Sequence, residues 1–253
     1  MDNKTINEGL RKIYNFCSEE GYDIVGVFLF GSQNYGVSDE NSDLDFKVIC
    51  KSLPANRDFF SFEQEGKDGI LNIVTIKDFV DAINTGYHTW YELLFTEYYL
   101  INPDYRTIWE SVRTLREQLV RENLEKHLRQ EIFYLEEQLD LMELTKDFRH
   151  VSNNKRLSYF YRIEFLINNL LAGEEYSYCL RPTEDLKNKI LWLKRRSPLT
   201  IEECQRQAQE IYQSCKTTVD LFLQDKDFPD TAKSYNRISQ LMLNIEEEGN
   251  GTI

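Results

Sequence analysis

The feature that most constrains this chain is a polar stretch, Gly31–Asp45, held between two apolar runs. Residues 24–30 (IVGVFLF) precede the stretch, and residues 46–50 (FKVIC) follow it. Short apolar runs bounded by turn residues are typical of buried β-strands. The order therefore predicts a strand that ends at a Gly-Ser turn, then a polar loop, then a second strand over 43–50 that opens with Asp-Leu-Asp.

Two acidic side chains open this second predicted strand. Residues i and i+2 of a strand point to the same face, so we expect Asp43 and Asp45 side by side and Leu44 turned into the core. Carboxylates held this close repel each other unless a cation lies between them. Such hard oxygen ligands suit Mg²⁺, which usually takes one or two carboxylates plus substrate phosphates. The alternative is a Gly/Asn/Ser-rich hairpin whose acids simply face water.

The Gly31-Ser32 turn allows backbone N–H groups to approach a phosphate with no side chain in the way. Gly31-Ser32 followed by Asp43-x-Asp45 resembles the DNA polymerase β-type nucleotidyltransferase superfamily. The resemblance implies a small mixed-sheet core of the α/β (α+β) class. It also implies transfer of a nucleoside monophosphate from a nucleoside triphosphate to a hydroxyl, with release of pyrophosphate. Asp43 and Asp45 would be catalytic and would hold Mg²⁺, and Gly31 and Ser32 would bind the triphosphate.

The superfamily usually supplies a third carboxylate from a later strand. Residues 59–65 and 70–76 are predicted to be strands, joined by a hairpin-type connection over 66–69. The second of these has the apolar flanks of that position, but its central residue is Asn72. Asn is neutral and a poorer metal ligand than a carboxylate, so an enzyme with Asn72 there could be slow, altered in metal use or inactive. The alternatives are a half-exposed structural Asn72 and a third acid at Asp68, Glu63 or Glu65.

A narrower resemblance is to the RlaP family, named for an association with RNA repair operons. It rests on a Gly-Ser-x-x-Tyr-Gly form of the first motif, on Ser-Asp-x-Asp, and on two later blocks. The additional residues that match are Tyr35, Gly36, Ser42, Glu92–Phe95 and Asn102-Pro103. The resemblance implies that Tyr35 and Ser42 belong to the nucleotide-binding site.

A helix predicted over 155–171 and ended by Gly173 extends this resemblance. Lys155, Tyr159 and Arg162 fall at i, i+4 and i+7, on one helix face. The resemblance implies that Lys155 and Arg162 hold triphosphate oxygens and that Tyr159 stacks on the base or sugar. The alternative is a surface helix with ordinary salt bridges.

Most of the remaining chain has apolar residues at helical spacing. Helical structure is predicted over 5–20, 108–142, 155–171, 184–194, 201–223 and 235–245, with the apolar face of the second stretch running from Leu124 to Met142. The charges of that stretch are expected to form a solvated face, and Thr200 is expected to open its helix with a capping box. We therefore expect a nucleotidyltransferase core over 1–105 and a helical domain over 106–253.

The net charge of −13 argues against broad electrostatic binding to nucleic acid, because phosphate contacts need Lys and Arg. Lys194-Arg195-Arg196 is the strongest basic cluster. The family resemblance implies an RNA acceptor such as tRNA, whereas the charge favours a small molecule or a protein. Two further hypotheses stay open: a catalytically impaired nucleotide-binding or regulatory module, and a toxin–antitoxin or defence enzyme that modifies a protein or tRNA.

The composition also bears on the compartment. No run of about eighteen apolar residues occurs, so no membrane span is expected, and the first residues lack the pattern of a signal peptide. The five cysteines are odd in number and none lies in Cys-x-x-Cys. They are expected to be reduced thiols of a cytoplasmic protein, not a disulfide framework or a zinc site.

Overall fold

The computed structural model describes residues 3–38, 42–52, 59–64, 67–143, 151–196, 199–224, 226–228 and 232–248. The chain forms two compact units. The sheet unit comprises residues 1–34, 38–123 and 229–253, and the helical unit comprises residues 35–37 and 124–228. The sheet unit therefore takes in residues 106–123 and 229–253, which the sequence pattern assigns to the helical domain.

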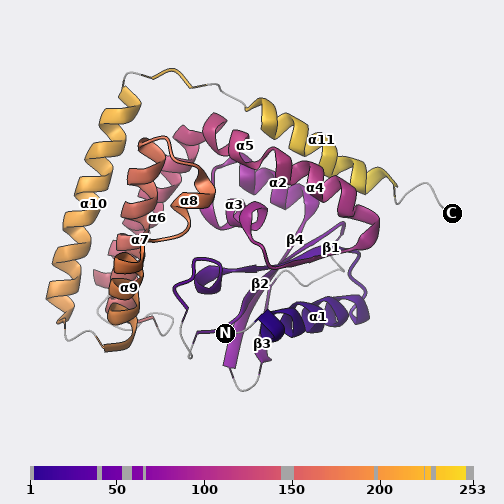
Figure 1. The fold of residues 1–253 in the computed structure, drawn as a ribbon, viewed down its shortest axis with the longest axis horizontal. Helices are drawn as coiled ribbons and strands as arrows, with labels where there is room; N and C mark the ends of the chain where they lie inside the picture. Colours follow the sequence, from indigo (N-terminus) through magenta and orange to yellow (C-terminus); the bar gives the residue numbers. More distant parts are fainter. Residues whose placement is uncertain are drawn as a thin grey trace. The chain divides into compact units, whose positions relative to one another are not determined.

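The described part of the sheet unit contains a five-stranded mixed sheet with the order β3-β4-β2-β1-β5 (Figure 1). The strands are β1 (Ile24–Phe30), β2 (Asp45–Cys50), β3 (Phe59–Gln64), β4 (Lys67–Thr75) and β5 (Tyr99–Ile101). β2 and β4 run parallel, and the other neighbours run antiparallel. This mixed sheet with its helices confirms the predicted α/β (α+β) class.

Two predicted strand limits are wrong. β2 begins at Asp45, not at Asp43, because β1 ends at Phe30, whose partner across the ladder is Asp45. β4 begins at Lys67, where it pairs with Gln64, so 67–69 are strand and not connection. Residues 65–66 lie outside the described part of the chain.

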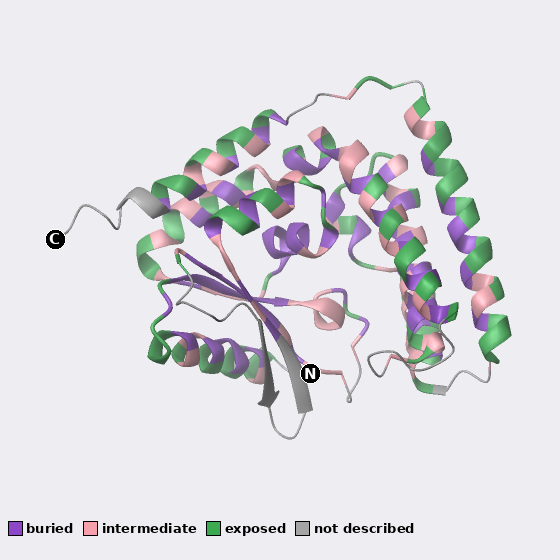
Figure 2. Cartoon of the chain, turned by 180° about the vertical axis from the view of Figure 1, so that it is seen from behind, coloured by how far each residue is buried: buried purple, intermediate pink, exposed green. Residues whose placement is uncertain are grey.

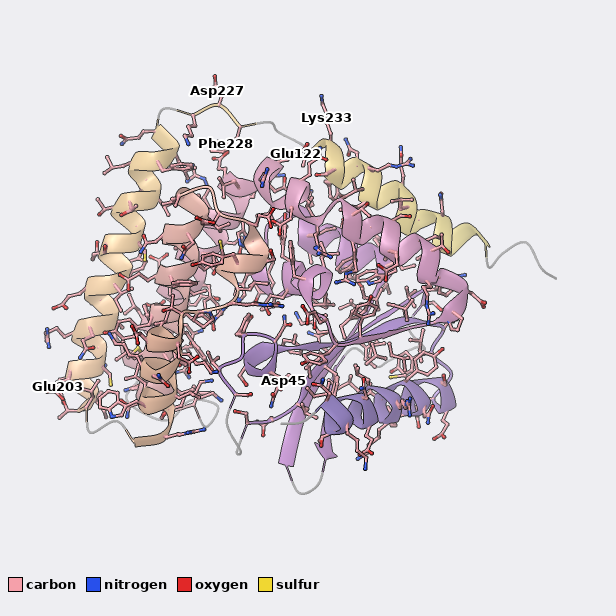
Figure 3. All side chains as sticks on the ribbon, in the orientation of Figure 1. Asp45, Glu122, Glu203, Asp227, Phe228 and Lys233 are labelled. Carbon is pink, nitrogen blue, oxygen red and sulfur yellow. The ribbon has the colours of Figure 1, made fainter. Side chains whose placement is uncertain are left out.

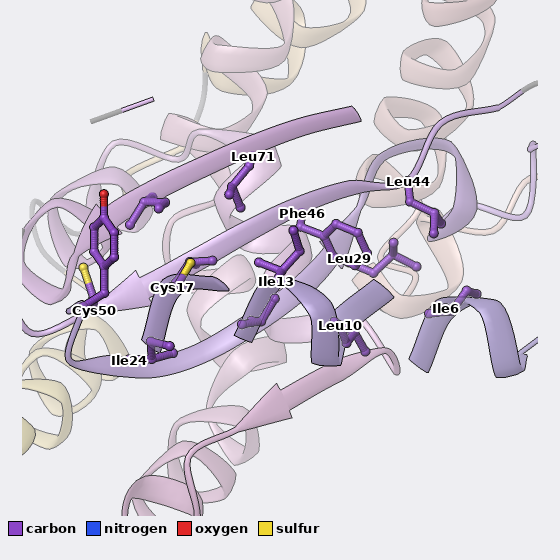
Figure 4. Packing of buried hydrophobic residues seen from close by; sticks show 14 residues of the cluster. Ile6, Leu10, Ile13, Cys17, Ile24, Leu29, Leu44, Phe46, Cys50 and Leu71 are labelled. Carbon is purple, nitrogen blue, oxygen red and sulfur yellow. The ribbon is translucent and has the colours of Figure 1, made fainter. Parts of the chain in front are cut away.

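One face of the sheet packs against α1 (Asn3–Glu19), in agreement with the predicted helix over 5–20. The apolar side chains of α1 recur at helical spacing, and those of β1, β2 and β4 alternate along their strands. Together they form one buried cluster (Figure 4). Its members include Ile6, Leu10, Ile13, Val27, Leu29, Leu44, Phe46, Val48, Leu71 and Ile73. Gly21 ends the helix with φ +84°.

Helices of the sheet unit cover the opposite face of the sheet. They are α2 (Ile76–Asn84), α3 (His88–Phe95), α4 (Arg106–Thr114), α5 (Arg116–Glu122) and α11 (Lys233–Glu248). The ring of Trp109 on α4 is fully buried and lies 4.7 Å from the ring of Phe28 on β1. α11 packs on α2, α4 and α5, and Ser234 donates hydrogen bonds to Glu122 through both its backbone N and its Oγ. These contacts join residues 106–123 and α11 to the sheet.

The helical unit contains α6 (Leu124–Glu143), α7 (Asn153–Leu171), α8 (Tyr176–Cys179), α9 (Glu184–Arg196) and α10 (Ile201–Gln224). α10 packs against α6 and α7, and α9 packs against α7. Figure 2 shows the resulting stripe of buried residues along α10. The predicted capping box at its start is confirmed, because Thr200 and Glu203 bond each other's backbone N–H through their side chains. No helix in the described ranges has the length and apolarity needed to cross a bilayer.

Candidate active site

The pairing of β1 with β2 brings the Gly-Ser turn to the Asp-x-Asp motif. Phe30, the last residue of β1, pairs with Asp45, the first residue of β2, so Gly31 follows directly beside Asp45. Asp45 is labelled in Figure 3. Gly31 has φ +77°, a conformation that L residues rarely adopt. A Cβ on Gly31 would lie 2.9 Å from Oδ2 of Asp45. The carboxylate therefore occupies the space that a side chain at Gly31 would need.

After Gly31 the chain forms a short 3₁₀ turn, Gly31–Gln33, which the backbone N–H of Asn34 closes by donating to the carbonyl of Gly31 at 3.0 Å. Ser32 is half-buried in this turn. The sequence therefore places a glycine in the left-handed region and a hydroxyl residue after it, directly beside an acidic side chain. Such a turn exposes backbone and hydroxyl donors to an anion.

Asp43 precedes β2 and is not held by the ladder. Asp43 and Asp45 are both half-buried, whereas Leu44 between them is 5% exposed and belongs to the core cluster. The predicted alternation is therefore confirmed for Leu44, although only Asp45 lies in a strand. Ser42, a predicted nucleotide-binding residue, is half-buried next to Asp43.

The parallel pairing of β2 with β4 determines which residues lie beside Asn72. Asn72 pairs with Lys47, which lies two residues after Asp45. Paired residues of neighbouring strands point to the same face, so Asn72 shares a sheet face with Lys47 and, two residues earlier, with Asp45. Asn72 is half-buried there. Of the alternative third acids, Glu63 and Asp68 pair with each other between β3 and β4, and Glu65 lies outside the described residues.

The residues near the start of β2 fit a divalent cation. Asp45 fills the cradle next to Gly31, and Asp43 and Asn72 add further oxygen donors of the kind that Mg²⁺ and similar hard ions prefer. Nowhere in the described ranges do three His, Cys, Asp or Glu residues gather as metal ligands. A site here therefore depends on two carboxylates plus an uncharged oxygen.

Lys47 is a buried lysine on this face that the sequence pattern did not single out. It is 3% exposed, and its Nζ donates to the carbonyl of Thr89 at 3.0 Å and to Oγ1 of Thr89 at 2.6 Å. The same Nζ lies 3.8 Å from the ring centroid of Trp90. Burial holds the pKa of Lys47 well below its usual value. Lys47 thus ties β2 to the start of α3 on the face that carries Asp45.

The remaining predicted nucleotide-binding residues belong to the helical unit. Lys155 is exposed and Tyr159 is half-buried on α7, whereas Arg162 is 8% exposed. The guanidinium carbon of Arg162 lies 4.2 Å from the ring centroid of Tyr35, which is itself 8% exposed. Arg156, on another side of α7, is also buried and donates to Oε1 of Gln138 at 2.8 Å.

Two ionisable residues of α6 lie in the core of the helical unit. His127 and Glu131 are both fully buried, with His127 Nε2 3.6 Å from Glu131 Oε1. The expectation that the charges of this helix form a solvated face is therefore wrong for Glu131. Burial raises the pKa of the Glu131 carboxyl to about 8, although the charge of Arg162 lowers it.

Comparison with known proteins identifies the family to which this chain belongs. The family model of the nucleotidyltransferase domain matches residues 10–170. The chain therefore belongs to the nucleotidyltransferase domain family, in agreement with the Gly-Ser turn and the two aspartates. Domains of this family take a nucleoside triphosphate and act with a divalent metal ion. The narrower resemblance to the RlaP family stays a prediction.

Two individual proteins are similar to this chain. One, from Methanocaldococcus jannaschii, carries the name "Putative protein adenylyltransferase MJ1305" and is 40% identical over 58 residues, which are 22% of this chain and 40% of that protein. The other is the crystal structure of a nucleotidyltransferase-like protein from Exiguobacterium sibiricum. It is 10% identical, with 96% of this chain and 89% of that chain covered, at a TM-score of 0.35. A likeness at that score does not establish a shared fold.

Proposed function

We propose that this protein is a Mg²⁺-dependent nucleotidyltransferase that moves a nucleoside monophosphate from a nucleoside triphosphate to a hydroxyl and releases pyrophosphate. The observation that carries the proposal is the contact between the two motifs: Gly31, with its positive φ, lies against the carboxylate of Asp45. That arrangement puts anion-binding backbone next to a cation-binding side chain, as transfer from a metal–triphosphate complex requires.

The proposal gives each of five residues of the sheet unit a role. Asp43 and Asp45 hold the metal through their carboxylates, and Asn72 offers a weaker amide oxygen on the same face. Gly31 and Ser32 bind the phosphates through backbone N–H groups and a hydroxyl, which favours the charge that develops on the leaving pyrophosphate. Bound Mg²⁺ would supply Lewis-acid activation of the phosphoryl group. Lys155 and Tyr159 of the helical unit stay predicted nucleotide-binding residues.

We favour a protein hydroxyl as the acceptor. The net charge of −13 disfavours a polyanionic acceptor, and one similar protein is named as a protein adenylyltransferase. An RNA acceptor such as tRNA is the alternative that the RlaP resemblance implies. The sequence spans less than half of that named protein, so its activity is not transferred to this chain by similarity alone.

A direct test uses α-labelled nucleoside triphosphates, one base at a time, with Mg²⁺ or EDTA. The purified protein is incubated with host-cell protein from which RNA has been removed, with total tRNA, or alone. We expect Mg²⁺-dependent release of pyrophosphate and label in the protein fraction. The variant in which Asp43→Asn and Asp45→Asn are combined should give neither, while its metal-free melting temperature holds or rises because two like charges are removed.

Label in tRNA alone would replace the protein acceptor with RNA and keep the transfer chemistry. Nucleotide binding without pyrophosphate from any base or acceptor would favour a second function, a catalytically impaired nucleotide-binding module. The specific observation behind that second function is Asn72, an uncharged residue on the Asp45 face. Loss of metal-free stability in the double variant would mean that the acids are structural, which would contradict the site.

A further inference from the structure

The segment between the two motifs is held by the helical unit. Tyr35–Val37 belongs to that unit, although the residues before and after it, up to Asn34 and from Ser38, belong to the sheet unit. Tyr35 is 8% exposed and Val37 is 2% exposed, so both side chains are removed from water. A short stretch that is buried in this way is fixed by specific contacts within its unit.

Two contacts fix the segment, one through a side chain and one through the backbone. The guanidinium of Arg162, on α7, lies over the ring of Tyr35 at 4.2 Å. The Nζ of Lys194, on α9, donates a hydrogen bond to the carbonyl of Val37 at 3.0 Å. α7 and α9 pack on each other, so the two cations act from one rigid support. Gly36 between the contacts has φ +69°, which allows the chain to turn from one to the other.

We propose that Tyr35–Val37 is a strap by which the helical unit positions the Gly31-Ser32 turn, with Arg162 and Lys194 as positioning residues. The inference rests on the proposed function of that turn. Only Gln33 and Asn34 separate the turn from Tyr35, so fixing Tyr35 removes backbone freedom from the turn before a phosphate binds. A binding loop that is already ordered loses less conformational entropy when its ligand arrives.

This role differs from the one that the sequence predicts for Arg162. A residue that binds phosphate contacts the triphosphate directly, whereas a positioning residue acts through its contact with Tyr35. A double-mutant cycle separates the two, because effects that share one contact are not additive. If Arg162 acts through Tyr35, Arg162→Met should weaken nucleotide binding in the wild-type background and add nothing in a Tyr35→Leu background.

Lys194→Met provides a second, independent variant, since a change at buried Arg162 can also prevent folding. Lys189→Met is its matched control: Lys189 lies on the same helix, is exposed, and contacts the ring of Tyr161 at 3.5 Å instead of the strap. Lys194→Arg keeps a donor for the Val37 carbonyl and should therefore behave as the wild type does.

The experiment has two readouts on the full chain. Hydrogen–deuterium exchange of residues 31–38 without nucleotide should be faster in Lys194→Met than in the wild type or Lys189→Met. Mg²⁺-dependent affinity for ATP, or for whichever labelled base the transfer assay selects, should fall about three- to tenfold in Lys194→Met and in Tyr35→Leu, as expected for loss of one ordered contact.

Unchanged exchange in Lys194→Met would overturn the strap, and additive losses for Arg162→Met and Tyr35→Leu would make Arg162 a direct ligand instead. If the wild type itself binds no nucleotide, the proposed function fails. The exchange comparison then still decides whether the strap orders the turn.

Discussion

Replacement of Gly31 by Ala tests the contact on which the proposed site rests. Ala would have to adopt φ +77°, which costs about 1–2 kcal/mol for a residue with a Cβ. In addition, its Cβ would lie 2.9 Å from Oδ2 of Asp45, closer than real Cβ atoms come to an oxygen. The carboxylate is the movable partner, so we expect Gly31→Ala to displace the group that is proposed to hold the metal.

Gly21→Ala is the matched control for backbone strain. Gly21 has φ +84°, lies in the same unit, and has nothing within 4 Å of its Cβ position. Both variants should therefore lose about 1–2 kcal/mol of stability from strain. That loss corresponds to about 2–8 °C in melting temperature for a chain of this size class.

The two variants should differ in their response to ligand. Ligand at about one hundred times its Kd stabilises the native state by about 2.7 kcal/mol, so Mg²⁺ with ATP should raise the melting temperature of the wild type and of Gly21→Ala. We expect Gly31→Ala to lose that increase. An undiminished increase in Gly31→Ala would place the metal and the triphosphate away from this turn. Loss of the increase in both variants would mean that backbone strain alone abolishes binding.

Three further changes test other parts of the structure. Asn72→Asp should lower the melting temperature in EDTA and enlarge the increase in melting temperature that Mg²⁺ produces, since a third carboxylate would join the site. Equal increases in mutant and wild type would show that Asn72 lies outside the metal site. Glu131→Gln should remove a pH dependence of stability. Because burial raises the pKa of Glu131 from 4.5 to about 8, the folded protein keeps a proton that the unfolded chain releases, and wild-type stability falls as pH rises through that window. Urea unfolding at pH 5 and pH 8 measures this, and a parallel decline in the variant would contradict it. Lys47→Ala should cost about 2 kcal/mol more in unfolding free energy than Lys47→Met, because Met keeps most of the buried stem against Trp90; equal losses would show that the charge alone matters.

Strands β1 to β4 and the longer helices could be predicted because their apolar residues follow simple periods, whereas the three-residue β5 was not predicted. The two motifs could also be located, since each follows or opens an apolar run. The start of β2 could not be predicted, because it depends on where β1 ends. Asp43 lies in a sequence typical of a strand, but the ladder between β1 and β2 ends at the pair Phe30 and Asp45. The start of β4 was misplaced for a similar reason, as the pairing of Gln64 with Lys67 is a property of two strands together.

Two buried ionisable residues carry a signal of burial in the sequence itself. Lys47 lies two residues before Ile49, which is fully buried, so strand alternation alone turns Lys47 to an enclosed face. Glu131 lies three residues after Leu128 and four before Leu135, inside the apolar stripe of its helix. In each case a charge at an apolar position predicts burial. The partners, such as Thr89 and Trp90 for Lys47, come from segments whose placement the sequence pattern does not define.

The packing of the hydrophobic core sets the register of β2, and this register determines the face on which Asp45 lies. Leu44 and Phe46 pack into the cluster beneath α1, and Asp45 between them takes the opposite face. A slip of one residue would turn Asp45 toward α1 and Phe46 away from it, since the side-chain period of a strand is two. That slip would bury a carboxylate among apolar side chains, which is strongly unfavourable. The same packing that stabilises the sheet unit therefore also holds the Asp45 carboxylate against Gly31, and the position of Asn72 opposite Lys47 follows from the same register.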